Sequence, residues 1–333
     1  MISSRIGDPM RVVAMTRNRG LSLIELMVSI VIGFLVVGSA IAIFDSNRQT
    51  YAASDSIGRI QENMRSAFEL IARDIREAAG TPCYPHINSL GNAVNSPASR
   101  WWTNAVPTMR LVGYTGAQAF PAGSFGTANA DRVAGTQAVQ MLSTSNSRAE
   151  ISSHNEAGSQ FVLNTVDHGM VTGDIVLACD YARASLVQLT SASSASATVS
   201  YSGGAVSPGN ATTALRPDDD SYTSGSVLAK WRAVRWYIGN NANAGRSLYQ
   251  STTVNTAGAL TVQNQEVVPG VQDLDMRYLV AENYLSADAV TNWNLVTAVR
   301  INFIIQGEAR VGTDGNPIQR TITHTIALRM RNK

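Results

Sequence analysis

The stretch that decides the fold is RGLSLIELMVSIVIGFLVVGSAIAIF, residues 19–44. Its last 24 residues carry a single charge, on Glu25. As a helix rising about 1.5 Å per residue they would span roughly 36 Å, enough to cross a hydrocarbon core of about 30 Å. Residues 1–20 carry four arginines against one aspartate, which places the N-terminus in the cytoplasm by the positive-inside rule. We therefore expect one membrane-spanning helix followed by an exported body.

A cleaved export signal is the alternative interpretation of this stretch. The apolar run is longer than the 7–15 residues usual for such a signal. Its one small-residue cluster, Gly38-Ser39-Ala40, lies inside the run and not at its end. The chain also keeps a helical pattern after Phe44, which favours an uncleaved helix.

The sequence beyond Phe44 is amphipathic. Apolar residues recur at steps of three or four, and charged residues fall largely elsewhere. The apolar set is Ile57, Ile60, Met64, Phe68, Ile71, Ile75 and Ala78; the charged set is Arg59, Glu62, Arg65, Glu69, Arg73, Asp74 and Glu77. With Gly80 as a C-terminal stop before Pro82, the pattern predicts one helix from residue 22 to about 79.

Glu25 is the exception within the apolar run. A carboxylate in a membrane span costs about 2.5–3.5 kcal/mol, so it needs a partner. No basic residue lies within residues 21–47. A cut between Gly20 and Leu21 would create an α-amino group close to Glu25, in the same subunit or in a neighbour. A protonated glutamate, or one that reaches the headgroups, is the alternative.

The junction Arg19-Gly20-Leu21-Ser22-Leu23-Ile24-Glu25 resembles the leader junction of type IV prepilins and type II secretion pseudopilins. The resemblance implies that a membrane aspartic prepilin peptidase cuts after Gly20 and N-methylates Leu21. Glu25 would then attract the amine of an adjacent subunit during assembly. Two residues depart from the common pattern: Leu21, where phenylalanine is commoner, and Ala42, near which many major pilins have a proline. Local melting of the assembled helix would then depend on Gly33 and Gly38.

Further segments resemble the PilW group of minor pilins, and their order carries the likeness more than any one of them. They are residues 62–65, 75–80, 173–180, 236–239, 247–249, 268–271, 299–301 and 326–332. The resemblance covers the first 80 and the last 110 residues well, and the middle poorly.

The exported body divides into two parts by composition. Residues 81–226 are rich in Ser, Ala, Thr, Asn and Gly, with short strands expected at 160–166, 174–177, 186–189 and 198–201. From residue 227 apolar and polar residues alternate around 234–238, 299–305 and 322–330, which predicts half-buried antiparallel sheet. We predict an α+β, pilin-like fold in which a long N-terminal helix packs on antiparallel sheet. Its parts are a leader (1–20), a transmembrane helix (21–44), an amphipathic continuation (45–80), a β-rich insertion (81–226) and a C-terminal sheet (227–333).

Cys83 and Cys179 are the two cysteines, and both follow the apolar run. In an exported body two cysteines predict one disulfide. It would close a loop of about a hundred residues and stabilise the fold by roughly 4 kcal/mol.

No catalytic motif is present, and we expect neither an enzyme nor a cofactor or metal site. The histidines His86, His154, His168 and His324 are scattered, and His324 suits a strand core. Three other clusters have open interpretations. Asp218-Asp219-Asp220 is a calcium ligand set or a solvated turn, and Trp101-Trp102 is an exposed docking surface or part of the core. Residues 230–237 interleave bases and aromatics, as a DNA-binding strand does, although strand alternation would split them between two faces.

The resulting hypothesis is a minor pilin that primes pilus assembly or lies at the pilus tip. Its partners would be other minor pilins, the major pilin, the peptidase and the inner-membrane assembly platform, and we do not expect nucleic acid. The chain would be single-pass in the inner membrane with a periplasmic body, and on the pilus or cell surface after assembly. The alternatives are a J-like type II secretion pseudopilin and a tip adhesin or DNA-capture subunit.

Overall fold

The computed structural model describes residues 20, 22–78, 89–104, 111–121, 124–181, 183–215, 221–312 and 314–328. The chain divides after Ala52 into two compact units, which are described separately. One helix, α1, runs from Leu23 to Glu77 over 55 residues, close to the predicted 22–79. The predicted stop at Gly80 lies outside the described residues.

The first unit contains the apolar part of α1. Every side chain from Ser22 to Tyr51 is exposed, including the large apolar ones. Among the described residues, α1 is the helix long and apolar enough to span a bilayer. Burial of such a surface in a membrane or against other helices removes it from water.

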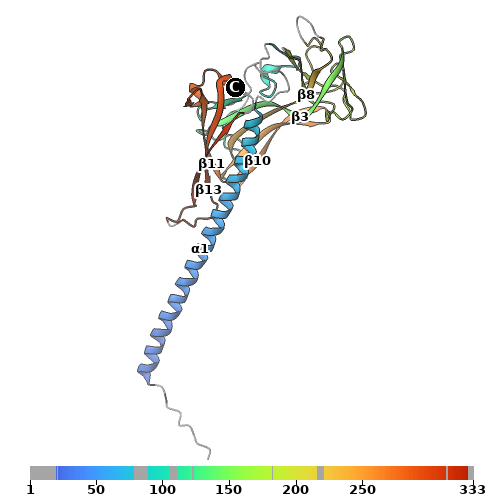
Figure 1. Cartoon of the computed structure of the whole chain (residues 1–333). Coiled ribbons are helices and arrows are strands. Elements are labelled where there is room, and N and C mark those ends of the chain that lie inside the picture. The colour runs from blue at the N-terminus through green and yellow to red at the C-terminus, as the bar shows by residue number, and fades with distance from the viewer. Residues whose placement is uncertain are drawn as a thin grey trace, which may run out of the picture. The chain divides into compact units, whose positions relative to one another are not determined.

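The second unit contains the end of α1, two sheets and three short 3₁₀ helices (Figure 1). The ten-stranded sheet comprises β1 (Ser89–Asn92), β2 (Leu111–Tyr114), β3 (Ala138–Asn155), β4 (Gln160–Leu163), β5 (Ile175–Cys179), β6 (Arg183–Gln188), β7 (Thr198–Ser200), β8 (Ser226–Asn240), β9 (Arg246–Thr256) and β10 (Ala259–Pro269). The four-stranded sheet has the order β12-β11-β13-β14, from β11 (Val271–Val280), β12 (Asn283–Leu285), β13 (Val296–Gln306) and β14 (Gln319–Ala327). The 3₁₀ helices are η1 (Pro97–Ser99), η2 (Ala287–Ala289) and η3 (Trp293–Leu295). The named strand pairs are antiparallel except β1 with β6.

The organising strand of the larger sheet is β8. One of its edges pairs with β3, from Ser226 to Tyr237. Its other edge pairs first with β5 and then, from Val234 onward, with β9. Strands from residues 81–226 and from residues 227–333 are therefore hydrogen-bonded within one sheet.

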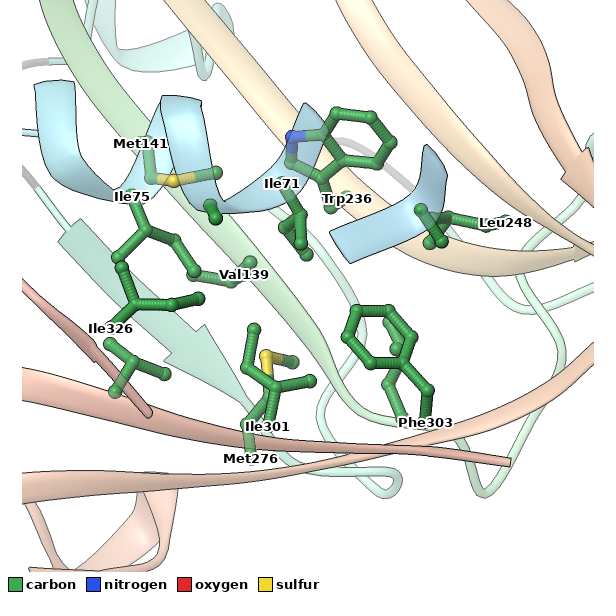
Figure 2. Packing of buried hydrophobic residues seen from close by; sticks show 14 of the residues in the cluster. Ile71, Ile75, Val139, Met141, Trp236, Leu248, Met276, Ile301, Phe303 and Ile326 are labelled. Atoms are coloured by element: carbon green, nitrogen blue, oxygen red, sulfur yellow. The ribbon is translucent and has the colours of Figure 1, made fainter. Parts of the chain in front are cut away.

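The principal core joins the end of α1 to both sheets, as the alternating C-terminal pattern predicts (Figure 2). Most of the buried α1 positions repeat at steps of three and four: Ser56, Ile60, Met64, Ala67, Ile71 and Ile75, with Ala72 and Asp74 buried beside them and Ala78 just after the helix. They meet side chains of β3, β8, β11, β13 and β14, including Met141, Trp236, Met276, Ile301 and Ile326. Burying a side chain of this size contributes about 1.5–3 kcal/mol, so this core fixes the amphipathic part of α1 to the body.

The buried stripe differs from the predicted one, since it includes Ser56, Ala67 and Ala72, which were not expected there. Ile57 and Phe68 are only half-buried, because the small residues Ser56 and Ala67 occupy the centre of the stripe. A Cβ added to Gly307 would lie 2.3 Å from Ser56 Oγ, which shows how closely the backbone following β13 approaches α1 here. Asp74, expected among the solvent-facing charges, is 1% exposed.

Candidate functional site at the N-terminal junction

The helix begins with a reciprocal capping arrangement between Ser22 and Glu25. The Glu25 amide donates to Ser22 Oγ at 3.2 Å, and the Ser22 amide donates to Glu25 Oε2 at 3.2 Å. This is the S-x-x-E capping box, which satisfies two amides that a helix start leaves unpaired. The carboxylate also lies at the positive end of the helix dipole. Glu25 is thus held at the first turn by backbone donors of its own chain.

This arrangement adds to the sequence-based account of Glu25. From the sequence, Glu25 was expected to pair with an α-amino group, to be protonated, or to reach the headgroups. The cap is a further partner, which was not predicted. The signal was available, because a serine three residues before a glutamate, ahead of an apolar run, is a helix-start signature. Leu21, which would carry the new amine, lies outside the described residues, so its role stays a prediction.

The glycines near the junction have no steric role within the chain. A Cβ added at Gly20, Gly33 or Gly38 would meet no atom within 4 Å. Glycine inside a helix is less favourable than alanine by about 0.5–1 kcal/mol, so Gly33 and Gly38 weaken the isolated helix.

The other end of α1 is fixed by a buried polar cluster around Asp74. Its Oδ2 accepts from Trp236 Nε1 at 2.8 Å and from Gln250 Nε2 at 3.0 Å. Its Oδ1 lies 2.8 Å from Arg232 Nη2 in an ion pair that lacks hydrogen-bond geometry. Glu77, one helical turn later, lies 3.8 Å from the same guanidinium. These contacts tie the helix to β8 and β9, so a load on the helix would be transmitted to the sheet.

Two family models match the chain at its two ends. Residues 15–41 match the prokaryotic N-terminal methylation motif, which contains the Gly20 junction and Glu25. Residues 235–329 match the model described as type IV pilus-assembly protein W. The two matches are consistent with a PilW-type pilin. Neither a curated protein nor a solved structure matches it.

Both matched families are described by modification and assembly, not by catalysis. The match to the PilW model begins within β8 and ends just beyond β14. It therefore includes Trp236 and Gln250 but not Asp74, which the helix contributes to the same cluster. The two matches therefore fall on the start of the chain, including the first part of α1, and on strands of its C-terminal part.

The two tryptophans that suggested an exposed docking surface are buried in the body. Trp101 and Trp102 are 6% and 5% exposed, so the interpretation as an exposed adhesive surface was wrong and the core interpretation is confirmed. Arg235, Trp236 and Tyr237 are buried as well.

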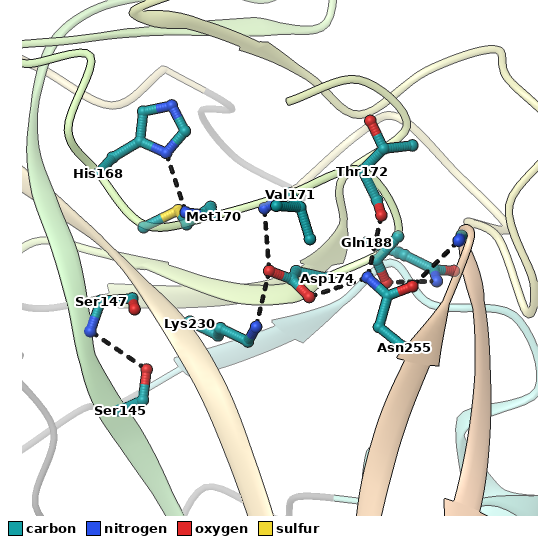
Figure 3. A network of polar contacts seen from close by, with 12 residues as sticks. Ser145, Ser147, His168, Met170, Val171, Thr172, Asp174, Gln188, Lys230 and Asn255 are labelled. Carbon is teal, nitrogen blue, oxygen red and sulfur yellow. Dashed lines mark hydrogen bonds and ion pairs between the residues drawn. The ribbon is translucent and has the colours of Figure 1, made fainter. Parts of the chain in front are cut away.

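Lys230 is engaged by its own chain, and so is Asp174 of the 173–180 segment. Lys230 Nζ lies 2.9 Å from Asp174 Oδ2 (Figure 3). The same carboxylate accepts from the Val171 amide at 3.0 Å, and its Oδ1 accepts from Asn255 Nδ2 at 2.9 Å. With Arg232 paired to Asp74, these bases are not free to track a phosphate backbone, and the DNA-strand interpretation has no support.

The described histidines serve packing. His324 stacks on Phe68 of α1 with ring centroids 3.9 Å apart, as its place in a strand core predicted. His154 stacks on Phe161, and His168 accepts from the Met170 amide at 3.1 Å. In the described part of the chain, no three His, Cys, Asp or Glu side chains gather as a metal site. His86 and Asp218-Asp219-Asp220 lie outside it.

Cys179 ends β5 and is buried at 1% exposure. The described residues contain no free cysteine. Cys83 lies outside them, so its pairing with Cys179 remains a prediction.

Proposed function

We propose that this chain is a minor pilin that is cut after Gly20, methylated on Leu21, and drawn into a priming or tip complex through Glu25. In the inner membrane its N-terminus would be cytoplasmic and its body periplasmic. The match to the pilus-assembly model supports a pilus over a secretion pseudopilus. A body of about 250 residues is bulky for a subunit repeated along a thin fibre, which supports a place at the start of assembly.

The observation that carries the proposal is the environment of Glu25. It is the single charge in an exposed apolar run, and its hydrogen-bond partner is Ser22 of its own chain. The α-amino group of a neighbouring subunit carries a full positive charge. The Ser22 amide, which donates to the carboxylate in the cap, is only a dipole. In a medium of low dielectric the exchange favours the ion pair, so assembly would replace the cap contact with an intersubunit contact.

Variants of this junction separate the charge from the cap. Glu25→Gln keeps an oxygen that accepts from the Ser22 amide but loses the charge. Ser22→Ala removes the hydroxyl acceptor and keeps the charge. We expect both variants, and Glu25→Ala, to be cut by the peptidase, because the cut bond lies before them.

The readout is incorporation into sheared fibres, measured by immunoblot against the membrane fraction of the same cells. Glu25→Gln and Glu25→Ala should reduce incorporation at least tenfold, and Ser22→Ala by less than threefold. Normal incorporation of Glu25→Gln would overturn the role of the charge. Loss in Ser22→Ala and Glu25→Ala, with normal incorporation of Glu25→Gln, would assign Glu25 to helix capping instead.

A further inference from the structure

A cavity of about 360 Å³ lies in the body, between the segment after η1, Phe120 with residues 124–132, and strands β8 to β10. Its lining combines guanidinium groups with aromatic rings: Arg100, Trp101, Phe120, Arg132, Arg235 and Tyr237. Hydroxyl and amide groups from Ser124, Ser251 and Asn264 complete it. None of these residues belongs to the junction or to the membrane span.

Arg235 is a buried charge with neutral partners. Its side chain comes from the middle of β8 and is 3% exposed. Nε donates to Gln140 Oε1 at 2.9 Å, and Nη2 donates to the Pro121 carbonyl at 3.2 Å. The guanidinium carbon lies 4.1 Å from the centre of the Trp101 ring and 4.3 Å from that of Phe120.

Arg132 is a second buried arginine whose hydrogen-bond partners are neutral. It is 2% exposed, and it donates to the carbonyls of Gln118, Thr115 and Thr136 at 2.8, 2.9 and 2.5 Å. Its Nε is buried without a partner. It also lies 4.6 Å from the Phe120 ring, so both guanidiniums contact the same ring.

The cavity therefore has an excess of positive charge. Burial lowers the pKa of both Arg132 and Arg235 to about 10, which leaves them charged at neutral pH. Among the described residues no ion pair involves Arg100, Arg132 or Arg235, and the one lining carboxylate, Asp131, accepts from the Ala128 amide at 2.9 Å. Buried charges are ordinarily paired, because an unpaired one is destabilising.

We propose that this cavity binds an acidic sugar, with the carboxylate at the arginines and the ring against the aromatic side chains. Guanidinium groups recognise carboxylates through paired, charge-assisted hydrogen bonds. Aromatic faces suit the apolar face of a sugar ring, and the serine and asparagine groups suit its hydroxyls. The volume lies at the lower end of the range for small-molecule sites, which fits one or two sugar units.

The test is calorimetric titration of the full chain, purified in detergent, with glucuronate. Glucose and acetate are the comparison probes. Glucose has the sugar ring without a carboxylate, and acetate has a carboxylate without the ring. We expect glucuronate to bind at least tenfold more tightly than either, and more weakly as salt is raised. No glucuronate binding, or equal binding of glucose or acetate, would overturn the proposal.

Two variants locate the binding without removing a fully buried charge. Arg100→Ala removes a lining guanidinium that is only half-buried, and Val262→Trp adds bulk at a lining position that is 43% exposed. Both should weaken glucuronate binding at least fivefold, and Arg246→Ala, which does not line the cavity, should leave it unchanged. Unaltered affinity in Val262→Trp would place the ligand elsewhere and overturn the assignment. Because the assay needs no fibre, its failure would not affect the proposed role in assembly.

Discussion

Trp236 Nε1 donates a hydrogen bond to Asp74 Oδ2 at 2.8 Å, between residues 162 positions apart in the chain. It joins the last turn of α1 to the middle of β8, beside the core shown in Figure 2. The indole and the carboxylate are both nearly inaccessible to solvent, with 1% exposure each. This hydrogen bond can form only while α1 is packed against the sheet.

Asp74→Ala should destabilise the body strongly. It leaves the Arg232 charge and two buried donors without their acceptor, which costs about 3 kcal/mol. Trp236→Phe, which removes one donor and keeps most of the ring, should cost about 1–2 kcal/mol. Denaturant unfolding of both variants and of the double variant measures the coupling, and strictly additive losses would show that the two residues do not act together.

Two glycine substitutions should have opposite effects on stability. Gly58 is an exposed position on α1 with no atom within 4 Å of an added Cβ, so Gly58→Ala should stabilise by about 0.5–1 kcal/mol. Gly113 lies on β2, and an added Cβ would lie 2.1 Å from the Tyr278 hydroxyl. Gly113→Ala should therefore destabilise by about 2 kcal/mol or more. The denaturation midpoints of both variants test these predictions. A Gly113→Ala variant more stable than the unchanged protein would contradict the close packing of Tyr278 against Gly113.

Stability should fall at alkaline pH in part through Tyr237. Burial raises the pKa of this phenol to about 12, and its hydroxyl donates to the Ala130 carbonyl at 2.8 Å. Between pH 10 and 12 the unfolded chain loses this proton while the folded chain keeps it, so stability falls as pH rises, by up to about 2 kcal/mol. Unfolding measured at pH 9 to 11.5 should show a shallower decline for Tyr237→Phe. Identical slopes for the two proteins would contradict this assignment.

Chemical modification tests the predicted disulfide between Cys83 and Cys179. Alkylation of the denatured, unreduced protein should modify neither Cys83 nor Cys179. Cys83→Ser should lower the free energy of unfolding by about 2–4 kcal/mol, as Cys179→Ser does, since either change opens the same loop. A thiol at Cys83 that reacts before reduction would exclude the bond.

The long helix could be predicted because its pattern is local. A continuous apolar run, followed by apolar residues at steps of three and four, predicted a helix from residue 22 to about 79. The observed helix runs from Leu23 to Glu77. The alternating strands β8, β13 and β14 were predicted for the same reason, and their apolar faces do cover the helix. The strands β1, β2, β3, β9, β10, β11 and β12 were not predicted. Of these, β3 and β9 pair with β8, and β10 pairs with β9, so contacts distant in the sequence decide their structure.

The polar contacts could not be predicted from local pattern. Asp74 reads as a surface charge because the three groups that bury it lie on strands far along the chain. Arg132 and Arg235 are separated by 103 positions along the sequence, and both contact the Phe120 ring. The cap at Ser22 is the exception, because its Ser-x-x-Glu motif is local and lies within residues 22–25.

The most direct test of the central claim is the intact mass of the protein extracted from membranes, with and without prepilin peptidase in the cells. The account predicts a chain that begins at a methylated Leu21 when the peptidase is present, and an intact leader when it is absent. Residues 1–20 retained in both cases would contradict it.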